Sequence, residues 1–264
     1  EHRARERERS PRHPQAGHHL DPASVAKLAT DFPLTAAEIA DVVRAAGRGA
    51  GPLSIDAVRT VAMTRQRARL GRLAQFVPPS FTWDELVLPA EELERLRQIV
   101  ARQTYREQVL TTWNMASKLP YGSGTAALFS GPPGTGKTMA GAVMAREIGR
   151  ELYRVDLSRI VDKYLGETEK NLGAIFDAAV DANAILLFDE ADSLFGKRTH
   201  VQSSHDRYAN METNYLLQRI EEHPGISILT TNNVASIDEA FARRIQFRVD
   251  FPFPDEVART EIWR

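Results

Sequence analysis

A glycine-rich loop between an apolar segment and a helix constrains this chain more than any other feature. The apolar run Thr125-Ala-Ala-Leu-Phe-Ser130 leads directly into Gly131-Pro-Pro-Gly-Thr-Gly-Lys-Thr138. The octapeptide fits the pattern G-x-x-x-x-G-K-[ST], in which backbone N–H groups turn inward around nucleotide phosphates at the start of a helix. Glycine permits the backbone angles that such a turn requires. The sequence therefore predicts a nucleoside triphosphate site.

Individual residues of this loop have expected roles. Lys137 would reach the β- and γ-phosphates, and Thr138 would coordinate Mg²⁺. A Gly/Pro-rich surface turn is the alternative, but the order strand, loop, helix favours the phosphate site. The predicted nucleotide-binding residues are Gly131, Pro132, Pro133, Gly134, Thr135, Gly136, Lys137, Thr138 and Met139.

Composition and charge narrow the class of protein. The chain has 264 residues, of which 42% are hydrophobic, enough for one large domain or two modest ones. It contains no cysteine, so disulfides and thiolate metal sites are excluded. No apolar run reaches the length of a membrane span, and we expect no membrane partner and a cytoplasmic location. Because the chain begins with Glu1 rather than methionine, we also expect it to be a fragment.

The chain divides into three predicted segments. Residues 1–19 alternate Arg with Glu and then become rich in Pro and His, which indicates a flexible arm. Residues 20–77 are predicted to form a small all-helical domain, in which Thr35 and Ser54 would cap helices. From residue 80 to 264, strands are expected to alternate with helices.

This alternation predicts a parallel sheet with helices on both faces, an α/β fold. A helix over residues 91–110 would precede it. The expected strands cover residues 126–130, 152–156, 185–189, 226–230 and 247–251, and the helices between them lie near 139–150, 169–181 and 211–222.

A pair of acidic residues follows one of these strands. In Ala184-Ile-Leu-Leu-Phe-Asp-Glu190, four apolar residues would be buried on both faces of the sheet, so that Asp189 emerges at its carboxyl edge. Asp189 would complete the Mg²⁺ shell through water, and Glu190 would orient and deprotonate the attacking water. The alternative is that these acids cap the next helix, but their place after a phosphate loop favours catalysis.

Three motifs together resemble those of the AAA+ ATPases. The loop at 131–138 resembles Walker A, Phe188-Asp-Glu-Ala-Asp192 resembles Walker B, and Leu229-Thr-Thr-Asn232 resembles sensor 1. The resemblance covers about residues 80–264. It implies a P-loop NTPase core with a five-stranded parallel sheet sandwiched by helices, catalysis of ATP hydrolysis with ATP and Mg²⁺, and a homo-oligomeric ring, expected to be a hexamer.

The same resemblance implies further assignments. Asn232 would be sensor 1 and would place the hydrolytic water. Lys137 would also be a catalytic residue. Residues 20–77 resemble, more weakly, the helical lid of a preceding degenerate AAA+ module. The family's own lid would begin where this chain ends, at Arg264, so lid and sensor 2 residues are not assigned.

A pair of arginines resembles the arginine fingers of the family. They lie in Ile237-Asp-Glu-Ala-Phe-Ala-Arg-Arg244, and such fingers reach the γ-phosphate of a neighbouring subunit. Arg243 and Arg244 match the paired positions, and Arg248 could be a second finger. The Pro-Gly-Arg that often follows is missing, so which arginine is the finger stays open, as does the alternative of a solvated helix end.

Residues 163–171, Lys-Tyr-Leu-Gly-Glu-Thr-Glu-Lys-Asn, resemble the first pore loop of members that thread protein substrates. Tyr164, Leu165 and Gly166 would project into a central channel and grip an extended peptide; local packing is the alternative. This implies a motor that remodels, unfolds or disassembles proteins. An ATP-gated assembly factor that does not thread is the second hypothesis.

A nucleic-acid remodeller is the third hypothesis, and charge weighs against it. Residues 1–77 carry a net charge of +5 and the remaining residues −6, and no basic stripe with interleaved aromatic residues is present. Four strings instead resemble the AAA+ ATPase encoded with extracellular, phage-tail-like contractile injection systems, which implies components of such a system as partners. These strings lie at residues 153–157, 205–210, 215–218 and 251–254.

Overall fold

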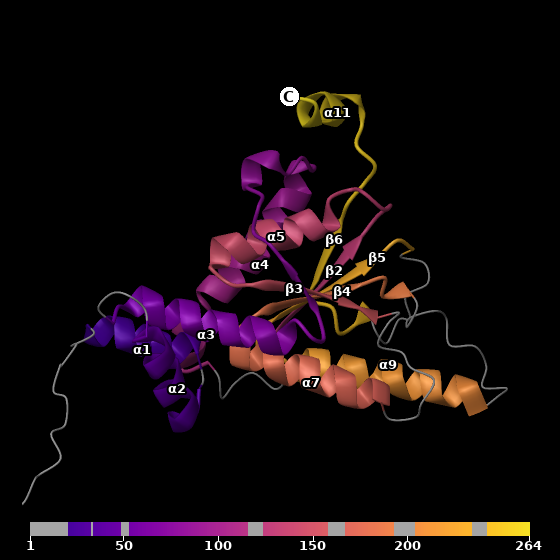
Figure 1. The fold of residues 1–264 in the computed structure, drawn as a ribbon. Coiled ribbons are helices and arrows are strands. Elements are labelled where there is room, and N and C mark those ends of the chain that lie inside the picture. Colours follow the sequence, from indigo (N-terminus) through magenta and orange to yellow (C-terminus); the bar gives the residue numbers. More distant parts are fainter. Residues whose placement is uncertain are drawn as a thin grey trace, which may run out of the picture.

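A computed structural model describes most of the chain, and Figure 1 shows its arrangement. The described residues are 21–32, 34–48, 53–115, 124–157, 167–192, 204–233 and 242–264.

A six-stranded mixed sheet forms the centre of the molecule, in the order β1-β3-β4-β5-β2-β6. Strands β2 to β6 are mutually parallel where they pair, which confirms the α/β fold and the five predicted parallel strands. The strands are β1 (Gln75–Val77), β2 (Thr125–Ser130), β3 (Leu152–Asp156), β4 (Ile185–Asp189), β5 (Ile226–Thr231) and β6 (Phe247–Asp250).

Strand β1 is a correction to the sequence analysis, which expected residues 20–77 to be entirely helical. It pairs antiparallel with β3 at the edge of the sheet, with Gln75 opposite Arg154 and Val77 opposite Leu152. Phe76 packs edge-on against Tyr153, with ring centroids 5.8 Å apart. A three-residue strand is too short to show an alternating pattern, so it depends on the exposed edge of β3 for its formation.

Helices cover both faces of the sheet, as predicted (Figure 1). On one face, α4 (Ala90–Thr104) and α5 (Lys137–Ile148) pack over a core that includes Phe129, Leu187 and Ile228. On the other face, α7 (Glu167–Ala182) and α9 (Ser204–Glu222) bury Phe176 and Phe188.

The N-terminal helices form a smaller cluster beside the sheet. They are α1 (Pro22–Asp31), α2 (Ala36–Ala46) and α3 (Ile55–Leu70). Thr35 and Glu38 make the expected capping box, and Ser54 accepts a hydrogen bond of 3.1 Å from the Ala57 N–H. The buried residues Val42 and Val58 belong to a separate small core, whereas Leu70 at the end of α3 enters the main core.

The predicted helix over 91–110 is shorter than expected. Helix α4 ends at Thr104, and a π-helical turn, η2 (Gln108–Thr112), follows it; a short 3₁₀ turn, η1 (Trp83–Glu85), precedes α4. Within the described part of the chain, every helix is too short or too polar to span a lipid bilayer.

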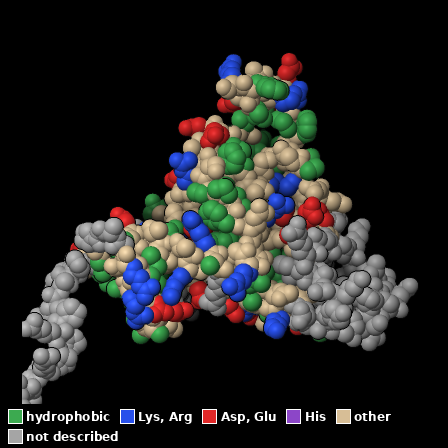
Figure 2. All heavy atoms as spheres, viewed as in Figure 1, with side chains coloured by type: hydrophobic (Ala, Val, Ile, Leu, Met, Phe, Trp, Pro, Cys, Tyr) green, Lys and Arg blue, Asp and Glu red, His purple; other side chains and the backbone are tan. Residues whose placement is uncertain are grey.

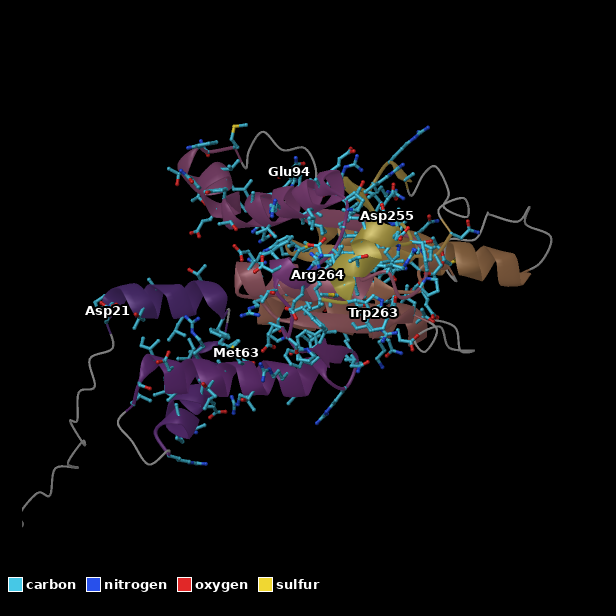
Figure 3. All side chains as sticks on the ribbon, turned by 90° about the horizontal axis from the view of Figure 1, so that it is seen from above. Asp21, Met63, Glu94, Asp255, Trp263 and Arg264 are labelled. Atoms are coloured by element: carbon cyan, nitrogen blue, oxygen red, sulfur yellow. The ribbon has the colours of Figure 1, made fainter. Side chains whose placement is uncertain are left out.

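The last helix, α11 (Glu256–Ile262), stands away from the body at the top of the molecule (Figure 1). Figure 2 shows hydrophobic side chains on this segment, and Figure 3 marks its two ends at Asp255 and at Trp263 and Arg264. Trp263 is 89% exposed and Phe253 is 71% exposed.

Candidate active site

The glycine-rich loop connects β2 to α5 with three glycines in backbone conformations that other residues rarely adopt. Their φ angles are +147° at Gly131, +78° at Gly134 and +97° at Gly136. A Cβ atom on Gly131 would lie 2.1 Å from the carbonyl oxygen of Phe251, so only glycine fits there. Among the described side chains, none caps the N-terminus of α5, so the first N–H groups of this helix remain available to an anion.

The ammonium group of Lys137 lies at the centre of the site. It donates to the carbonyl oxygens of Gly131 (2.6 Å) and Pro132 (2.8 Å) and to Oδ1 of Asn232 (3.0 Å). Lys137 is only 9% exposed. The pKa of its ammonium group is lowered, because the effect of burial exceeds the opposing effect of the charges of Asp189 and Asp192. Two predicted site residues from distant parts of the sequence, Lys137 and Asn232, are therefore in direct contact.

Asp189 ends β4 and is held from two sides. Its Oδ1 accepts hydrogen bonds from the hydroxyl of Thr230 (2.5 Å) and from the N–H of Glu190 (3.2 Å). Its Oδ2 forms an ion pair of 2.6 Å with Nη2 of Arg154 on β3. The sequence analysis assigned no role to Thr230 or Arg154. Thr230 lies inside the sensor 1 motif, where its position was a usable signal, whereas Arg154 lies in the string at residues 153–157, which gave it no role at this site.

Glu190 follows Asp189 with a left-handed backbone, at φ +54°. This region is uncommon for a non-glycine residue and recurs at active sites. The turn lets the N–H of Glu190 donate to Thr230 Oγ1 (3.3 Å) and the N–H of Ala191 donate to the Thr230 carbonyl (3.0 Å). The Glu190 side chain is exposed at the carboxyl edge of the sheet, where it can reach a water molecule.

Asp192 ties the acidic motif to the sensor strand. Its Oδ1 accepts a hydrogen bond from the hydroxyl of Thr231, and its Oδ2 accepts one of 3.0 Å from the N–H of Asn232. From the sequence, Asp192 was identified only as a member of the motif that resembles Walker B. In the fold it orients the backbone of Asn232, whose side chain meets Lys137.

These residues fit a magnesium–nucleotide complex. Mg²⁺ prefers oxygen ligands, and the Thr138 hydroxyl at the start of α5 and the Asp189 carboxylate are of this kind. The uncapped helix N-terminus and the ammonium of Lys137 suit phosphate oxygens. Pro132 and Pro133 are exposed on the loop, and Met139 is partly buried against the α4–α5 core.

The family model for the ATPase family associated with various cellular activities (AAA) matches residues 127–253, from β2 to the segment after β6. Over these residues the chain is similar to AAA ATPase domains and has their fold. The match lies inside the predicted segment 80–264 and includes the loop, Asp189, Glu190 and Asn232.

Relatives and solved structures show the same similarity. The chain is 31% identical over 185 residues to Cell division protein C of Sulfolobus acidocaldarius, covering 65% of this chain and 50% of that protein. It is 28% identical over 199 residues to 26S proteasome subunit RPT4 of Saccharomyces cerevisiae, covering 73% and 44%. It thus spans half or less of the length of these relatives. The crystal structure of the FIGL-1 AAA domain in complex with ADP superposes with a TM-score of 0.55 at 27% identity, covering 72% of this chain and 62% of that one.

Two of the three candidate arginines make contacts away from the phosphate loop. Nε of Arg244 forms an ion pair of 2.7 Å with Glu221 at the end of α9. Nη2 of Arg248 on β6 donates to the carbonyl of Ala242 (3.0 Å), and Arg243 is exposed. The expected pore-loop residues, Tyr164, Leu165 and Gly166, lie outside the described residues.

Proposed function

We propose that the protein hydrolyses ATP with Mg²⁺ as one subunit of a cytoplasmic hexameric ring. The observation that carries the proposal is the hydrogen bond of 3.0 Å from Nζ of Lys137 to Oδ1 of Asn232. The Asp189 carboxylate lies close enough to act on the charge of Lys137. The similarity to the FIGL-1 AAA domain, solved with ADP, supports an adenine nucleotide as the ligand.

Each residue then has a chemical role. Lys137 would bind the β- and γ-phosphates. Thr138 and Asp189 would hold Mg²⁺, which when bound would neutralise charge that develops on the phosphates. Glu190 accepts a proton from the attacking water, and Asn232 orients that water. Thr230 and Asp192 keep Asp189 and Asn232 in place through the hydrogen bonds described above.

Replacing Lys137 with alanine tests the nucleotide site. We expect the affinity for a fluorescent ADP analogue with Mg²⁺ to fall about ten- to a hundredfold, because a hydrogen bond to a charged group contributes roughly 1.5–3 kcal/mol. Equilibrium fluorescence titration measures the change. Lys170→Ala, at an exposed lysine of α7, is the matched control. Equal affinities for the two variants would contradict the assignment.

We further propose that the ring remodels protein substrates through a central pore. Similarity to a proteasome subunit supports a protein rather than a nucleic acid as the substrate, and the acidic balance after residue 77 agrees. We also propose, more specifically, that the ring acts on components of a contractile injection system. This proposal rests on sequence strings such as those at 153–157 and 251–254. An ATP-gated assembly factor that does not thread remains the alternative.

Replacing Tyr164 with alanine separates threading from assembly. We expect the rate of unfolding of a tagged fluorescent protein to fall at least about tenfold, because the aromatic ring that grips the chain is lost, while the ATPase rate changes much less. Tyr164→Phe keeps the ring and should unfold the substrate at nearly the normal rate. If Tyr164→Ala unfolds its substrate as fast as the unsubstituted protein, the threading proposal is wrong.

A further inference from the structure

The Asp189 carboxylate has an arginine partner that lies outside every motif of the site. Nη2 of Arg154 is 2.6 Å from Oδ2 of Asp189, while Thr230 and the Glu190 N–H occupy Oδ1. Both oxygens of the carboxylate therefore already have donors from the protein itself. A cation that approaches Asp189 meets a carboxylate whose charge is partly neutralised by Arg154.

Arg154 lies on β3, which pairs with β4 on one side and with β1 on the other. In the parallel ladder with β4, Arg154 lies opposite Leu187, two residues before Asp189. Alternate residues of a strand project from the same face, so Arg154, Leu187 and Asp189 share the face covered by α5. On the other side, β1 pairs with β3 so that Gln75 lies opposite Arg154. The short strand β1 thus supports the part of β3 that carries this arginine.

The ion pair of Arg154 with Asp189 is partly exposed to solvent. The Arg154 side chain is 41% exposed, and its Nε is buried without a hydrogen-bond partner among the described atoms. A cavity of about 670 Å³ lies beside it, bordered by the turn before β1 and by α7. Asp156, which lies opposite Asp189 in the β3–β4 ladder, also lines this cavity. The guanidinium group of Arg154 therefore borders open space, and the carboxylate of Asp156 lines the same cavity.

Arginine and Mg²⁺ carry charges of the same sign, so they compete for one carboxylate. Because the pair is partly exposed, solvent screens the competition and its effect is moderate. We propose that Arg154 is a positioning residue that holds Asp189 in competition with Mg²⁺ and thereby sets how strongly Mg²⁺ enhances nucleotide binding. This inference rests on the proposed function, since it takes Asp189 as the carboxylate of the magnesium site.

The test compares nucleotide affinity with and without Mg²⁺. For each variant, a fluorescent ADP analogue is titrated in EDTA and at a series of Mg²⁺ concentrations, and the ratio of the two dissociation constants measures the Mg²⁺ enhancement. In Arg154→Met we expect this ratio to rise about two- to fivefold, the range for a partly exposed ion pair. The affinity in EDTA should stay unchanged.

Three further variants make the result specific. Arg154→Gln, which also lacks the charge, should reproduce the rise, and Arg154→Lys, which retains it, should keep the original ratio. Arg67→Met is the matched control, because Arg67 pairs with Glu151 at the other end of β3 over 2.7 Å and is similarly exposed, at 48%. Its ratio should not change.

The outcomes separate the two proposals. An unchanged or lower ratio in Arg154→Met and Arg154→Gln overturns the role of Arg154, and so does an equal rise in Arg67→Met. If the unsubstituted chain binds no nucleotide under either condition, the proposed function fails and this inference fails with it. If that chain shows a Mg²⁺ enhancement that no Arg154 variant alters, the proposed function stands and only the role of Arg154 is wrong.

Discussion

Replacing Glu190 with glutamine should leave ATP binding intact and slow its hydrolysis about a hundredfold or more, the usual contribution of a general base. Glutamine has the same length as glutamate, so the left-handed backbone at φ +54° and its hydrogen bonds to Asp189 and Thr230 are preserved. What is lost is the carboxylate that accepts the proton of the attacking water. Phosphate release measures hydrolysis, and titration with a fluorescent ATP analogue measures binding.

A control separates the role of Glu190 from the loss of any negative charge. Glu94 is an exposed residue of α4 and is labelled in Figure 3. Glu94→Gln should bind and hydrolyse ATP at the normal rate. If Glu190→Gln also hydrolyses ATP at that rate, another group activates the water.

Removing the arginine finger should slow hydrolysis about a thousandfold or more, because such an arginine neutralises charge in the transition state of phosphoryl transfer. We expect this loss in Arg243→Ala or in Arg244→Ala. The finger acts on the neighbouring subunit, so each subunit should keep its own nucleotide affinity. Steady-state ATPase rates and nucleotide titrations of the two variants identify which arginine is responsible.

Mixed rings show whether that arginine acts between subunits. A subunit without the finger still has Glu190, and a Glu190→Gln subunit still has the finger. At some interfaces of a mixed ring both groups meet, so mixing two inactive variants should restore part of the ATPase rate. No recovery at any mixing ratio would place the arginine within its own subunit.

The ion pair of Arg244 with Glu221 supplies a further comparison. Glu221→Gln breaks this pair but leaves the arginine in place. If Arg244 is the finger, Glu221→Gln should retain most of the activity that Arg244→Ala loses. If both variants lose the same activity, Arg244 has a structural role, and Arg243 becomes the candidate finger.

The five parallel strands could be predicted from the sequence because each is a short segment with apolar residues between loops or helices, and β2 and β4 contain continuous apolar runs. Strands β3 and β4 have the predicted bounds, and β2, β5 and β6 differ by one residue at one end. Side chains buried on both faces of a sheet leave this mark directly in the sequence. The caps at Thr35 and Ser54 were predictable for a similar reason, since their hydrogen bonds join residues three apart.

Strand β1 and the end of α4 could not be predicted in the same way. Three residues form β1 because an exposed strand edge lies beside them, and its backbone hydrogen bonds leave no side-chain pattern. The apolar periodicity near residues 91–110 continues past Thr104, although the helix changes there to a π-helical turn. At β1, pairing with a distant segment decides the local conformation.

The sequence alone determined the phosphate loop, the acidic pair that follows β4 and the apolar strands that bring them together, because these features depend on residues close in the chain. Only the tertiary structure decided that Lys137 meets Asn232, that Asp192 holds the backbone of Asn232 and that Arg154 holds Asp189. Each of these contacts joins residues on different strands or loops. The order of the strands in the sheet sets their distances, and no local pattern of residues contains that order.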